Sequence, residues 1–271
     1  METAKGEYFL EISISTGLYY KKDYKEILDI IASTSCNNIE LFLNQAFIDV
    51  DASELEKEVS ERNLNILSVH TPLEFIAFPR KESENYWINK SIEISKIFNS
   101  KVIVSHMVMG EYFDNKIRGL DELHKQNMID YCEVKDVHVT TENLPYFDGG
   151  SFLGKFDELF NFISDNNIDL TFDTTHCAFS GFSILETFKE FKGFIKNIHL
   201  SDFDNGIEHK VLGEGSLPLK DFIVQLNKEN YDGLLTLELD FDNKKRNNIL
   251  NNEQAIKSIQ KSIDFITSNA K

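Results

Sequence analysis

Asp173 and His176 stand three residues apart at the end of a short apolar run, just before small and turn-forming residues. In an α/β protein a strand holds such a carboxylate in place, and the turn that follows lets the imidazole reach the same point, which is a common way to bind a divalent metal. An Asp and a His at this spacing are a weak signal by themselves. The signal gains weight only if neighbouring strands end in residues of similar chemistry.

The elements that must position these residues alternate along the chain. Eight short apolar runs alternate with eight longer amphipathic runs, as expected for successive β-strands and α-helices. The predicted strands are Phe9–Thr16, Asn38–Leu43, Asn65–Thr71, Lys101–Met107, Val137–Leu144, Asp169–Thr174, Lys196–Ser201 and Leu234–Asp240. The predicted helices are Tyr24–Ser33, Ser53–Asn63, Glu82–Phe98, Lys116–Tyr131, Phe152–Asn166, Ser183–Phe191, Pro218–Lys228 and Asn252–Ser268.

This alternation predicts a closed (β/α)8 barrel, a TIM barrel, that takes up residues 1–271 as a single domain. The alternative is a doubly wound open sheet, which usually has a glycine-rich turn after its first strand. Here that turn is Thr16–Tyr19, and it fits neither a dinucleotide-binding nor a P-loop pattern. The barrel is therefore preferred, and it requires an active site at the carboxyl ends of the strands.

Almost every predicted strand after the first ends in a residue that can bind a metal or transfer a proton. These residues are Glu40, His70, His106, Glu142, Asp173, His176, His199, Asp202 and Glu238. Each one alone is more often a structural residue than a ligand. Three of the carboxylates lie in or after apolar runs, however, where an ionised group is costly unless a cation or strong donors compensate it. The combination predicts a divalent metal at the mouth of the barrel.

Other features are interpreted without a catalytic role. His124 falls in a predicted helix and His138 at the start of a strand, so both are interpreted as surface or packing residues. Gly213 and Gly215 suggest either a phosphate cradle or a tight turn into the next helix, and the tight turn is the simpler interpretation.

The most specific motifs lie in the second half of the chain. They are Thr171–His176, Asn197–Asp202 and Leu212–Gly215, together with Glu142 and Glu238. With these motifs the chain resembles the xylose-isomerase-like TIM-barrel superfamily. That superfamily includes sugar and sugar-phosphate isomerases and epimerases, 2-keto-myo-inositol isomerase and the endonuclease IV enzymes that act at abasic sites.

Resemblance to the isomerase and epimerase branch implies one divalent metal, held by Glu142, Asp173, His199 and Glu238. The mixed oxygen and nitrogen ligands suit Mn²⁺, Mg²⁺, Co²⁺ or Zn²⁺. The same resemblance implies that Glu142 and Glu238 also act as acid and base, moving a proton beside a carbonyl through a metal-stabilised enediolate. The expected activity is isomerisation or epimerisation of a sugar, keto-polyol or related small hydroxycarbonyl compound.

The resemblance also implies contacts to substrate. His176 matches a position that touches a substrate oxygen, and His70, His209 and Glu40 are further candidate substrate contacts. A barrel that binds a small polyol without catalysis is a further alternative.

The endonuclease branch is the main alternative, and it implies two or three zinc ions and abasic sites in DNA as the target. A second metal would use His70 and His106. A third would use His176 and His209, but the aspartate that this branch needs beside His209 is replaced by Ile207, with Glu208 next to it. That replacement favours the isomerase branch and a substrate role for His176.

The overall charge also argues against a polyanionic partner. The formal net charge is −17 at pH 7, so the field of the whole molecule repels nucleic acid and anionic membranes. The N-terminus lacks a secretory pattern, and no run approaches the roughly 20 apolar residues of a membrane span. Three scattered cysteines fit a reducing compartment. We therefore expect a cytoplasmic enzyme with a small sugar or polyol substrate, no membrane partner, nucleic acid disfavoured, and a homodimer compatible with the sequence.

Overall fold

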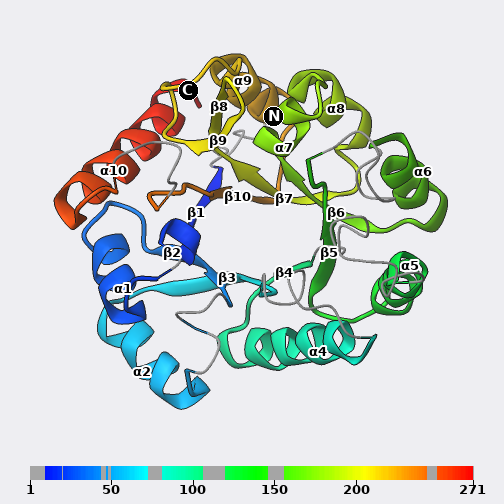
Figure 1. Ribbon diagram of the computed structural model, residues 1–271, viewed down its shortest axis with the longest axis horizontal. Helices are drawn as coiled ribbons and strands as arrows, with labels where there is room; N and C mark the ends of the chain where they lie inside the picture. Colours follow the sequence, from blue (N-terminus) through cyan, green and yellow to red (C-terminus); the bar gives the residue numbers. More distant parts are fainter. Residues whose placement is uncertain are drawn as a thin grey trace, which may run out of the picture.

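The computed structural model describes residues 10–19, 21–43, 47, 50–72, 81–105, 120–145, 156–242 and 249–270. Eight parallel strands in this part of the chain form a closed barrel, in the order β1-β10-β7-β6-β5-β4-β3-β2. Helices surround the ring of strands, so the strands form an inner layer and the helices an outer one (Figure 1). The predicted TIM barrel is confirmed.

The strands agree with the predicted ones to within a few residues at each end. They are β1 (Glu11–Ser15), β2 (Asn38–Phe42), β3 (Asn65–His70), β4 (Val102–Ser105), β5 (His138–Glu142), β6 (Asp169–Asp173), β7 (Ile195–Leu200) and β10 (Leu234–Leu237). The end of the predicted strand Lys101–Met107 lies outside the described residues. Because the strands are parallel, their carboxyl ends all lie at one end of the barrel.

Eight helices correspond to the predicted ones. They are α1 (Tyr24–Ala32), α2 (Ala52–Glu61), α4 (Lys81–Phe98), α5 (Leu120–Tyr131), α6 (Phe156–Asn166), α8 (Ile184–Phe191), α9 (Leu219–Lys228) and α10 (Asn252–Asn269). Several begin at a polar side chain that accepts a hydrogen bond from the first turn, such as Asp51 before α2 and Asn251 before α10. The predicted starts at Lys116 and Phe152 lie outside the described residues.

The sequence did not predict four short elements, which are η1 (Thr16–Leu18), α7 (Thr174–Phe179), β8 (Asp202–Asp204) and β9 (Ile207–Lys210). Helix α7 follows β6 directly because the Asp173 carboxylate caps it, accepting from the backbone N–H of His176 at 2.6 Å. Strands β8 and β9 form an antiparallel hairpin. Its turn residues, Asn205 and Gly206, have φ of 50° and 75°, the left-handed conformation that tight hairpins require.

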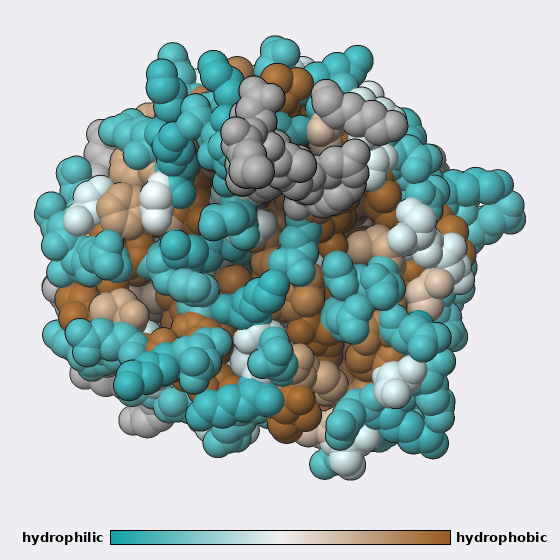
Figure 2. Space-filling model, turned by 180° about the vertical axis from the view of Figure 1, so that it is seen from behind, coloured by the Kyte–Doolittle hydropathy of each residue, from teal (hydrophilic) through white to brown (hydrophobic). Residues whose placement is uncertain are grey.

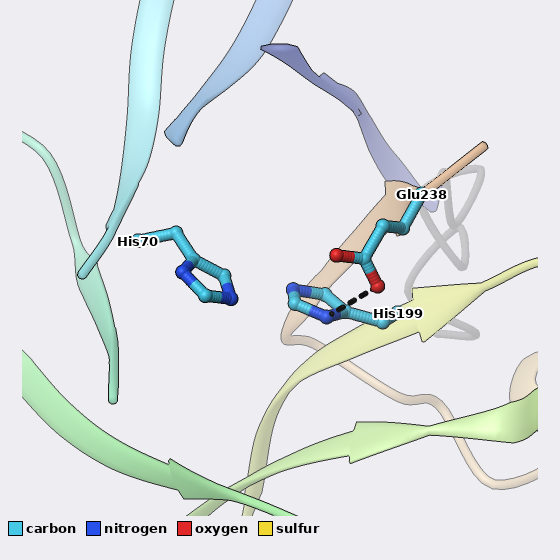
Figure 3. Close-up of side chains that lie close together, drawn as sticks. All are labelled: His70, His199 and Glu238. Atoms are coloured by element: carbon cyan, nitrogen blue, oxygen red, sulfur yellow. Dashed lines mark ion pairs between the residues drawn. The ribbon is translucent and has the colours of Figure 1, made fainter. Parts of the chain in front are cut away.

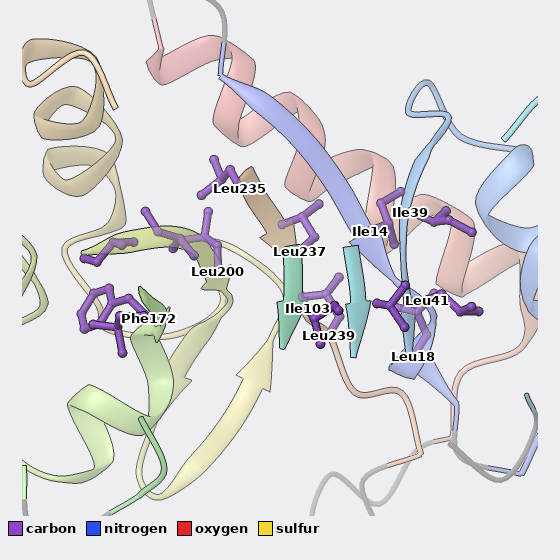
Figure 4. Close-up of a cluster of buried hydrophobic side chains, with 14 of the residues drawn as sticks. Ile14, Leu18, Ile39, Leu41, Ile103, Phe172, Leu200, Leu235, Leu237 and Leu239 are labelled. Carbon is purple, nitrogen blue, oxygen red and sulfur yellow. The ribbon is translucent and has the colours of Figure 1, made fainter. Parts of the chain in front are cut away.

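Apolar side chains from the strands pack together in the hydrophobic core. Ile14 of β1, Ile39 of β2 and Leu235 of β10 are fully buried there (Figure 4). The fully buried residues of the strands also include hydrogen-bonded polar side chains. Ser13 Oγ and Thr236 Oγ1 lie 2.8 Å apart across β1 and β10. The barrel thus contains polar layers that can hold a polar site.

Hydrophilic residues cover most of the face drawn in Figure 2, with hydrophobic residues visible between them. This surface agrees with a chain in which 27% of residues are charged. Among the described residues, no helix combines the length and the apolar character that crossing a bilayer demands.

Candidate metal centre

Four neighbouring strands bring the four predicted metal ligands together. Glu142 is the last residue of β5, and Asp173 is the last of β6. His199 lies one residue before the end of β7, and Glu238 directly follows β10. These strands are consecutive in the barrel, and the register pairs Asp173 with His199. One ligand atom from each of the four residues lies within 4.8 Å of the others.

His199 lies at the centre of this cluster. Its Nδ1 atom is 3.2 Å from Oε1 of Glu142 and 3.0 Å from Oε2 of Glu238. Figure 3 shows the His199 ring between the Glu238 carboxylate and the His70 ring. His199 and Glu142 are almost completely buried, whereas the Glu238 side chain is 15% exposed. The cluster is therefore more open to solvent on the side of Glu238.

Asp173 has one carboxylate oxygen engaged and one left over. Oδ1 accepts hydrogen bonds from the backbone N–H of His176 and from the hydroxyl of Thr175. Oδ2 is buried and has no hydrogen-bond partner among the described residues. Burial raises the pKa of Asp173 to about 6 against the opposing effect of the nearby imidazoles. A buried, unused carboxylate oxygen beside an imidazole nitrogen and two further carboxylates fits a divalent cation.

The carboxylates and imidazoles of the cluster set each other's protonation. Burial lowers the pKa of His199, but the neighbouring carboxylates, Glu238 foremost, outweigh burial and hold the pKa well above its usual value. Conversely, burial raises the pKa of Glu238, yet His199 and His209 outweigh burial and hold it below its usual range. Protons on the imidazoles thus balance the carboxylates, and a bound divalent cation would displace them.

His70, predicted at the end of β3, lies beside the four ligands. Its Nδ1 donates a hydrogen bond to the carbonyl of Thr71 at 2.7 Å, because a carbonyl oxygen can only accept. This leaves Nε2 facing Glu142, with Oε2 at 3.4 Å. The His70 ring is stacked on the His199 ring at 5.7 Å. His106, the other predicted residue of a second metal, lies outside the described residues.

His176, in helix α7, is held by Asn143, the residue that directly follows β5. Its Nδ1 donates to the carbonyl of Asn143 at 2.9 Å and lies 3.4 Å from Oε1 of Glu142. Burial lowers the pKa of His176, but the carboxylates of Asp173 and Glu142 outweigh burial and raise the pKa to about 10. Its Nε2 is directed to the hairpin, where Oε1 of Glu208 lies at 3.8 Å.

His209 reaches the site from strand β9. Its ring meets the His176 ring edge-on at 5.3 Å, and its Nδ1 is 3.7 Å from Oε2 of Glu238. The residue has φ of 54°, an uncommon conformation for a residue other than glycine and one that often occurs at functional sites. Asp173, His176 and His209 form a second group whose ligand atoms lie within 4.8 Å of one another.

Asn143 is a part of the site that the sequence did not single out. Its side-chain amide accepts from the backbone N–H of Asp173 at 2.8 Å and donates to the Asp173 carbonyl at 3.0 Å. These two bonds extend the pairing of β5 and β6 beyond Glu142. The only sequence signal for this role is the position of Asn143 directly after a strand-end ligand.

Asp202 proves to be the centre of a loop, separate from the metal ligands. Its buried carboxylate accepts from the backbone N–H groups of Phe203, Gly213, Gly215 and Leu217. A Cβ atom on Gly215 would lie only 2.3 Å from Oδ1 of Asp202, so this position requires glycine. The loop uses these amides to bind its own aspartate, which agrees with a tight turn and leaves no cradle for a phosphate.

Glu40 is placed deeper than the other predicted residues. It lies in the middle of β2, is fully buried, and approaches His199 from the side away from Glu238. Its recorded contacts are all to side chains of the barrel interior.

Residues 28–268 match the family described as xylose isomerase-like TIM barrel, and the chain belongs to this family. The fold and the buried cluster at the carboxyl ends of the strands agree with this membership. The protein is therefore a xylose isomerase-like TIM barrel with a candidate metal centre at the carboxyl ends of its strands.

Two curated relatives and one solved structure illustrate the likeness. The chain is 24% identical to the uncharacterized protein MJ1188 of Methanocaldococcus jannaschii, over 96% of this chain and 99% of that one. It is 26% identical to an inosose dehydratase of Clostridium botulinum, over 71% of this chain and 74% of the relative. The structure of a D-allulose 3-epimerase from Methylomonas sp. superposes with a TM-score of 0.76 at 16% identity, covering 96% and 98% of the two chains, which is a likeness of fold.

Proposed function

We propose that the protein is a divalent-metal-dependent isomerase or epimerase of a sugar, keto-polyol or related small hydroxycarbonyl compound. The observation that carries the proposal is the buried cluster of Glu142, Asp173, His199 and Glu238, one from each of four neighbouring strands. This set combines three carboxylates and one imidazole without a lysine or arginine among its members.

The four residues would hold one ion of Mn²⁺, Mg²⁺, Co²⁺ or Zn²⁺. When bound, such an ion polarises a carbonyl and stabilises the negative charge that develops on its oxygen when a neighbouring C–H loses its proton. Asp173 would bind the ion without transferring a proton, because its Oδ1 already caps α7 and its Oδ2 is the oxygen left to serve as a ligand.

The two glutamates would carry the proton. The Glu238 side chain is 15% exposed, whereas that of Glu142 is 1% exposed, so Glu238 is the one of the two that a substrate entering from solvent meets first. Glu142 is the matching group, and its Oε1 lies 3.2 Å from Nδ1 of His199, the nitrogen that Glu238 also approaches. In an epimerisation one glutamate, as the carboxylate, removes the proton, and the other, as the carboxylic acid, donates its own proton to the opposite face of the carbon.

The more exposed histidines would bind substrate hydroxyls. The side chains of His176 and His209 are 12% and 21% exposed, and both lie on the open side of the cluster. The hydrogen bond from His176 to Asn143 uses Nδ1. The other ring nitrogen, Nε2, would bind a substrate oxygen.

The related proteins support a reaction at a carbon beside a carbonyl. Epimerisation of a ketose beside its carbonyl and dehydration of a hydroxyketone both begin with removal of a proton from such a carbon. An inosose dehydratase among the relatives and a ketose 3-epimerase among the structures fit this first step. Dehydration is therefore a distinct possible outcome of the same proton abstraction.

The decisive experiment measures solvent deuterium entering a substrate. The metal-free protein is loaded in turn with Mn²⁺, Mg²⁺, Co²⁺ and Zn²⁺ and incubated in D₂O with a panel of ketopentoses, ketohexoses and inososes, followed by NMR and chromatography. Metal-dependent exchange at a carbon beside the carbonyl is expected, with an epimer or aldose as product. Loss of water from the substrate would assign the dehydratase reaction.

A nuclease activity has one observation in its favour, the second group of Asp173, His176 and His209. An oligonucleotide with an abasic site, incubated with the zinc-loaded protein across a salt series, tests it. Strong zinc-dependent incision with no exchange on any ketose would overturn the proposed isomerase or epimerase.

A further inference from the structure

The Glu40 carboxylate lies beside the ring nitrogen of His199 that faces away from the proposed metal ligands. The Glu40 oxygens Oε1 and Oε2 lie 3.1 Å and 3.2 Å from Nε2 of His199. The opposite ring nitrogen, Nδ1, faces Glu142 and Glu238. The imidazole therefore stands between Glu40 and the two glutamates that we propose as metal ligands.

Glu40 is itself held by donors from two strands. Ser68 Oγ and Asn197 Nδ2 both donate to Oε2 of Glu40, at 2.9 Å and 3.1 Å. The hydroxyl of Thr236 donates to the Asn197 amide oxygen at 2.8 Å and lies 2.8 Å from Ser13 Oγ. This chain of contacts fixes the amide of Asn197, because the flipped amide would set its oxygen against the Glu40 carboxylate. Five strands of the barrel thus contribute to the placement of one carboxylate.

We propose that Glu40 is a positioning residue for the metal centre, which fixes the orientation and tautomer of His199. Ser68 and Asn197 both donate to the Glu40 carboxylate, which therefore acts as an acceptor, so Nε2 of His199 carries the proton that faces Glu40. When a cation displaces the other ring proton, the lone pair lies on Nδ1 and is directed at the cluster of ligands. A carboxylate behind a ligating imidazole also raises its basicity and strengthens its bond to a metal. The inference rests on the proposed metal centre.

The other two histidines of the cluster are fixed in a different way. His70 donates to the backbone carbonyl of Thr71 and His176 to that of Asn143, at 2.7 Å and 2.9 Å. A carbonyl orients the ring but adds no full charge. All three rings lie near Glu142, but His199 has a second buried carboxylate, Glu40, at the ring nitrogen that faces away from Glu142, although burying such a group is costly. The cost of burying Glu40 is explained if its charge strengthens His199, the central residue of the four-residue cluster, as a metal ligand.

The test compares Mn²⁺ binding to the metal-free parent chain and to Glu40→Gln by isothermal titration calorimetry. The substitution keeps the shape of the side chain but removes its charge and offers an N–H group to His199. We expect the affinity for Mn²⁺ to fall by about 10- to 100-fold. In the zinc-loaded protein, NMR of the histidine ring should show a downfield Nε2–H resonance of His199 in the parent chain that moves upfield in the variant.

Thr140→Val is the matched control. Thr140 is equally buried in the barrel, and its hydroxyl contacts the Ile103 carbonyl and Thr171, neither of which belongs to the cluster. This variant should bind Mn²⁺ as the parent chain does. Equal loss of affinity in Glu40→Gln and Thr140→Val would overturn the inference, and so would parent-like binding and an unchanged Nε2–H resonance in Glu40→Gln.

A second variant covers the case in which Glu40→Gln does not fold, as judged by circular dichroism. Ser68→Ala removes one donor to Glu40 and leaves its charge in place, so we expect a smaller loss of Mn²⁺ affinity, and parent-like affinity would count against the inference. The two proposals fail separately. A parent chain that binds no divalent ion refutes the proposed metal centre, whereas equal binding by the parent chain and by Glu40→Gln refutes only the role of Glu40.

Discussion

At the amino ends of the strands, His138 Nδ1 lies 2.7 Å from Asp169 Oδ2, and at the carboxyl ends His199 Nδ1 lies 3.0 Å from Glu238 Oε2. The residue types and distances are alike, but the surroundings differ. The side chains of the first pair are 52% and 24% exposed, and those of the second pair are 0% and 15% exposed. Water screens the first pair, whereas the second depends on its protein neighbours for charge balance.

The amino end also supplies lysines that the four-residue cluster lacks. A hollow of about 580 Å³ there is lined by charged side chains, among them Glu11 and Lys101, whose Oε2 and Nζ atoms lie 2.9 Å apart. Lys196 Nζ lies 3.9 Å from Oδ1 of Asp169. At the carboxyl end, the ion pairs that Glu238 makes with the described residues are to the imidazoles of His199 and His209. The two ends carry the same types of residue. The carboxyl end is the candidate cation site because its carboxylates are buried and have no lysine among their ion-pair partners in the described residues.

Neutralising single carboxylates at the two ends of the barrel should have very different effects on the rate of deuterium exchange. We expect Glu238→Gln and Glu142→Gln to slow deuterium exchange into a ketose by about 10²- to 10⁴-fold, because each removes a group that transfers the proton. Asp169→Asn, at the other end, should exchange at the parent rate. A Glu238→Gln variant that keeps the parent rate would end the proposed role of this residue.

Asp202 is a buried carboxylate at the same end of the barrel, but backbone N–H groups of its own loop bind both of its oxygens. It should therefore matter for stability and not for metal binding. We expect Asp202→Ala to lower the free energy of unfolding by about 3 kcal/mol, since several backbone N–H groups lose a charged acceptor. Urea unfolding followed by circular dichroism measures the change. A loss below about 1 kcal/mol would mean that water replaces the carboxylate in this loop.

The pH dependence of stability should also differ between the metal-free and the metal-bound protein. The pKa of His176 is raised to about 10 in the folded chain, above its unfolded value near 6.5. This histidine therefore stabilises the metal-free protein fully below about pH 6.5, and the contribution is lost as the pH rises through about 10. Metal binding has the opposite dependence, because bound cations displace protons from the cluster.

We therefore expect the melting temperature of the metal-free protein to fall from about pH 6.5 to about pH 9, while the increase caused by Mn²⁺ grows. At a free concentration of 100 times Kd the ion adds about 2.7 kcal/mol. Differential scanning calorimetry at several pH values, with and without Mn²⁺, measures both trends. A metal-induced increase that shrinks as the pH rises would contradict the proposed displacement of protons.

The smallest effect is expected at the amino end. His138→Ala should change the free energy of unfolding by no more than about 1 kcal/mol, because exposed ion pairs contribute little. Mn²⁺ affinity should stay the same. A large loss of Mn²⁺ affinity in this variant would show that the two ends are coupled.

The barrel could be predicted from the sequence because each strand is a short apolar run between amphipathic helices. The ends of β5 and β6 were placed closely enough to bring Glu142 and Asp173 to the mouth of the barrel. The assignment of ligand roles to these residues remains a prediction, although the structure brings the four together.

The local features between the strands were harder to predict. Helix α7 has only six residues and is set by the Asp173 cap, which periodicity cannot reveal. The β8–β9 hairpin had a signal in Asn205 and Gly206, a pair typical of tight hairpin turns, but its strands have only three and four residues, too few for a clear strand pattern. The position of Glu40 behind His199 depends on contacts across the barrel that no local pattern contains.

The seam between β1 and β10 closes the barrel, and it joins residues that are 223 positions apart in the chain, Ser13 and Thr236. The four-residue cluster takes Glu238 from near the end of the sequence, and its neighbours Glu40 and His70 come from the first half. Contacts of such long range make folding slow, because the chain must lose much of its freedom before they form. Tight uptake of a metal ion during refolding should therefore appear only when β10 lies beside β7 and Glu40 of β2 stands behind His199, and it would report that these distant strands have come together.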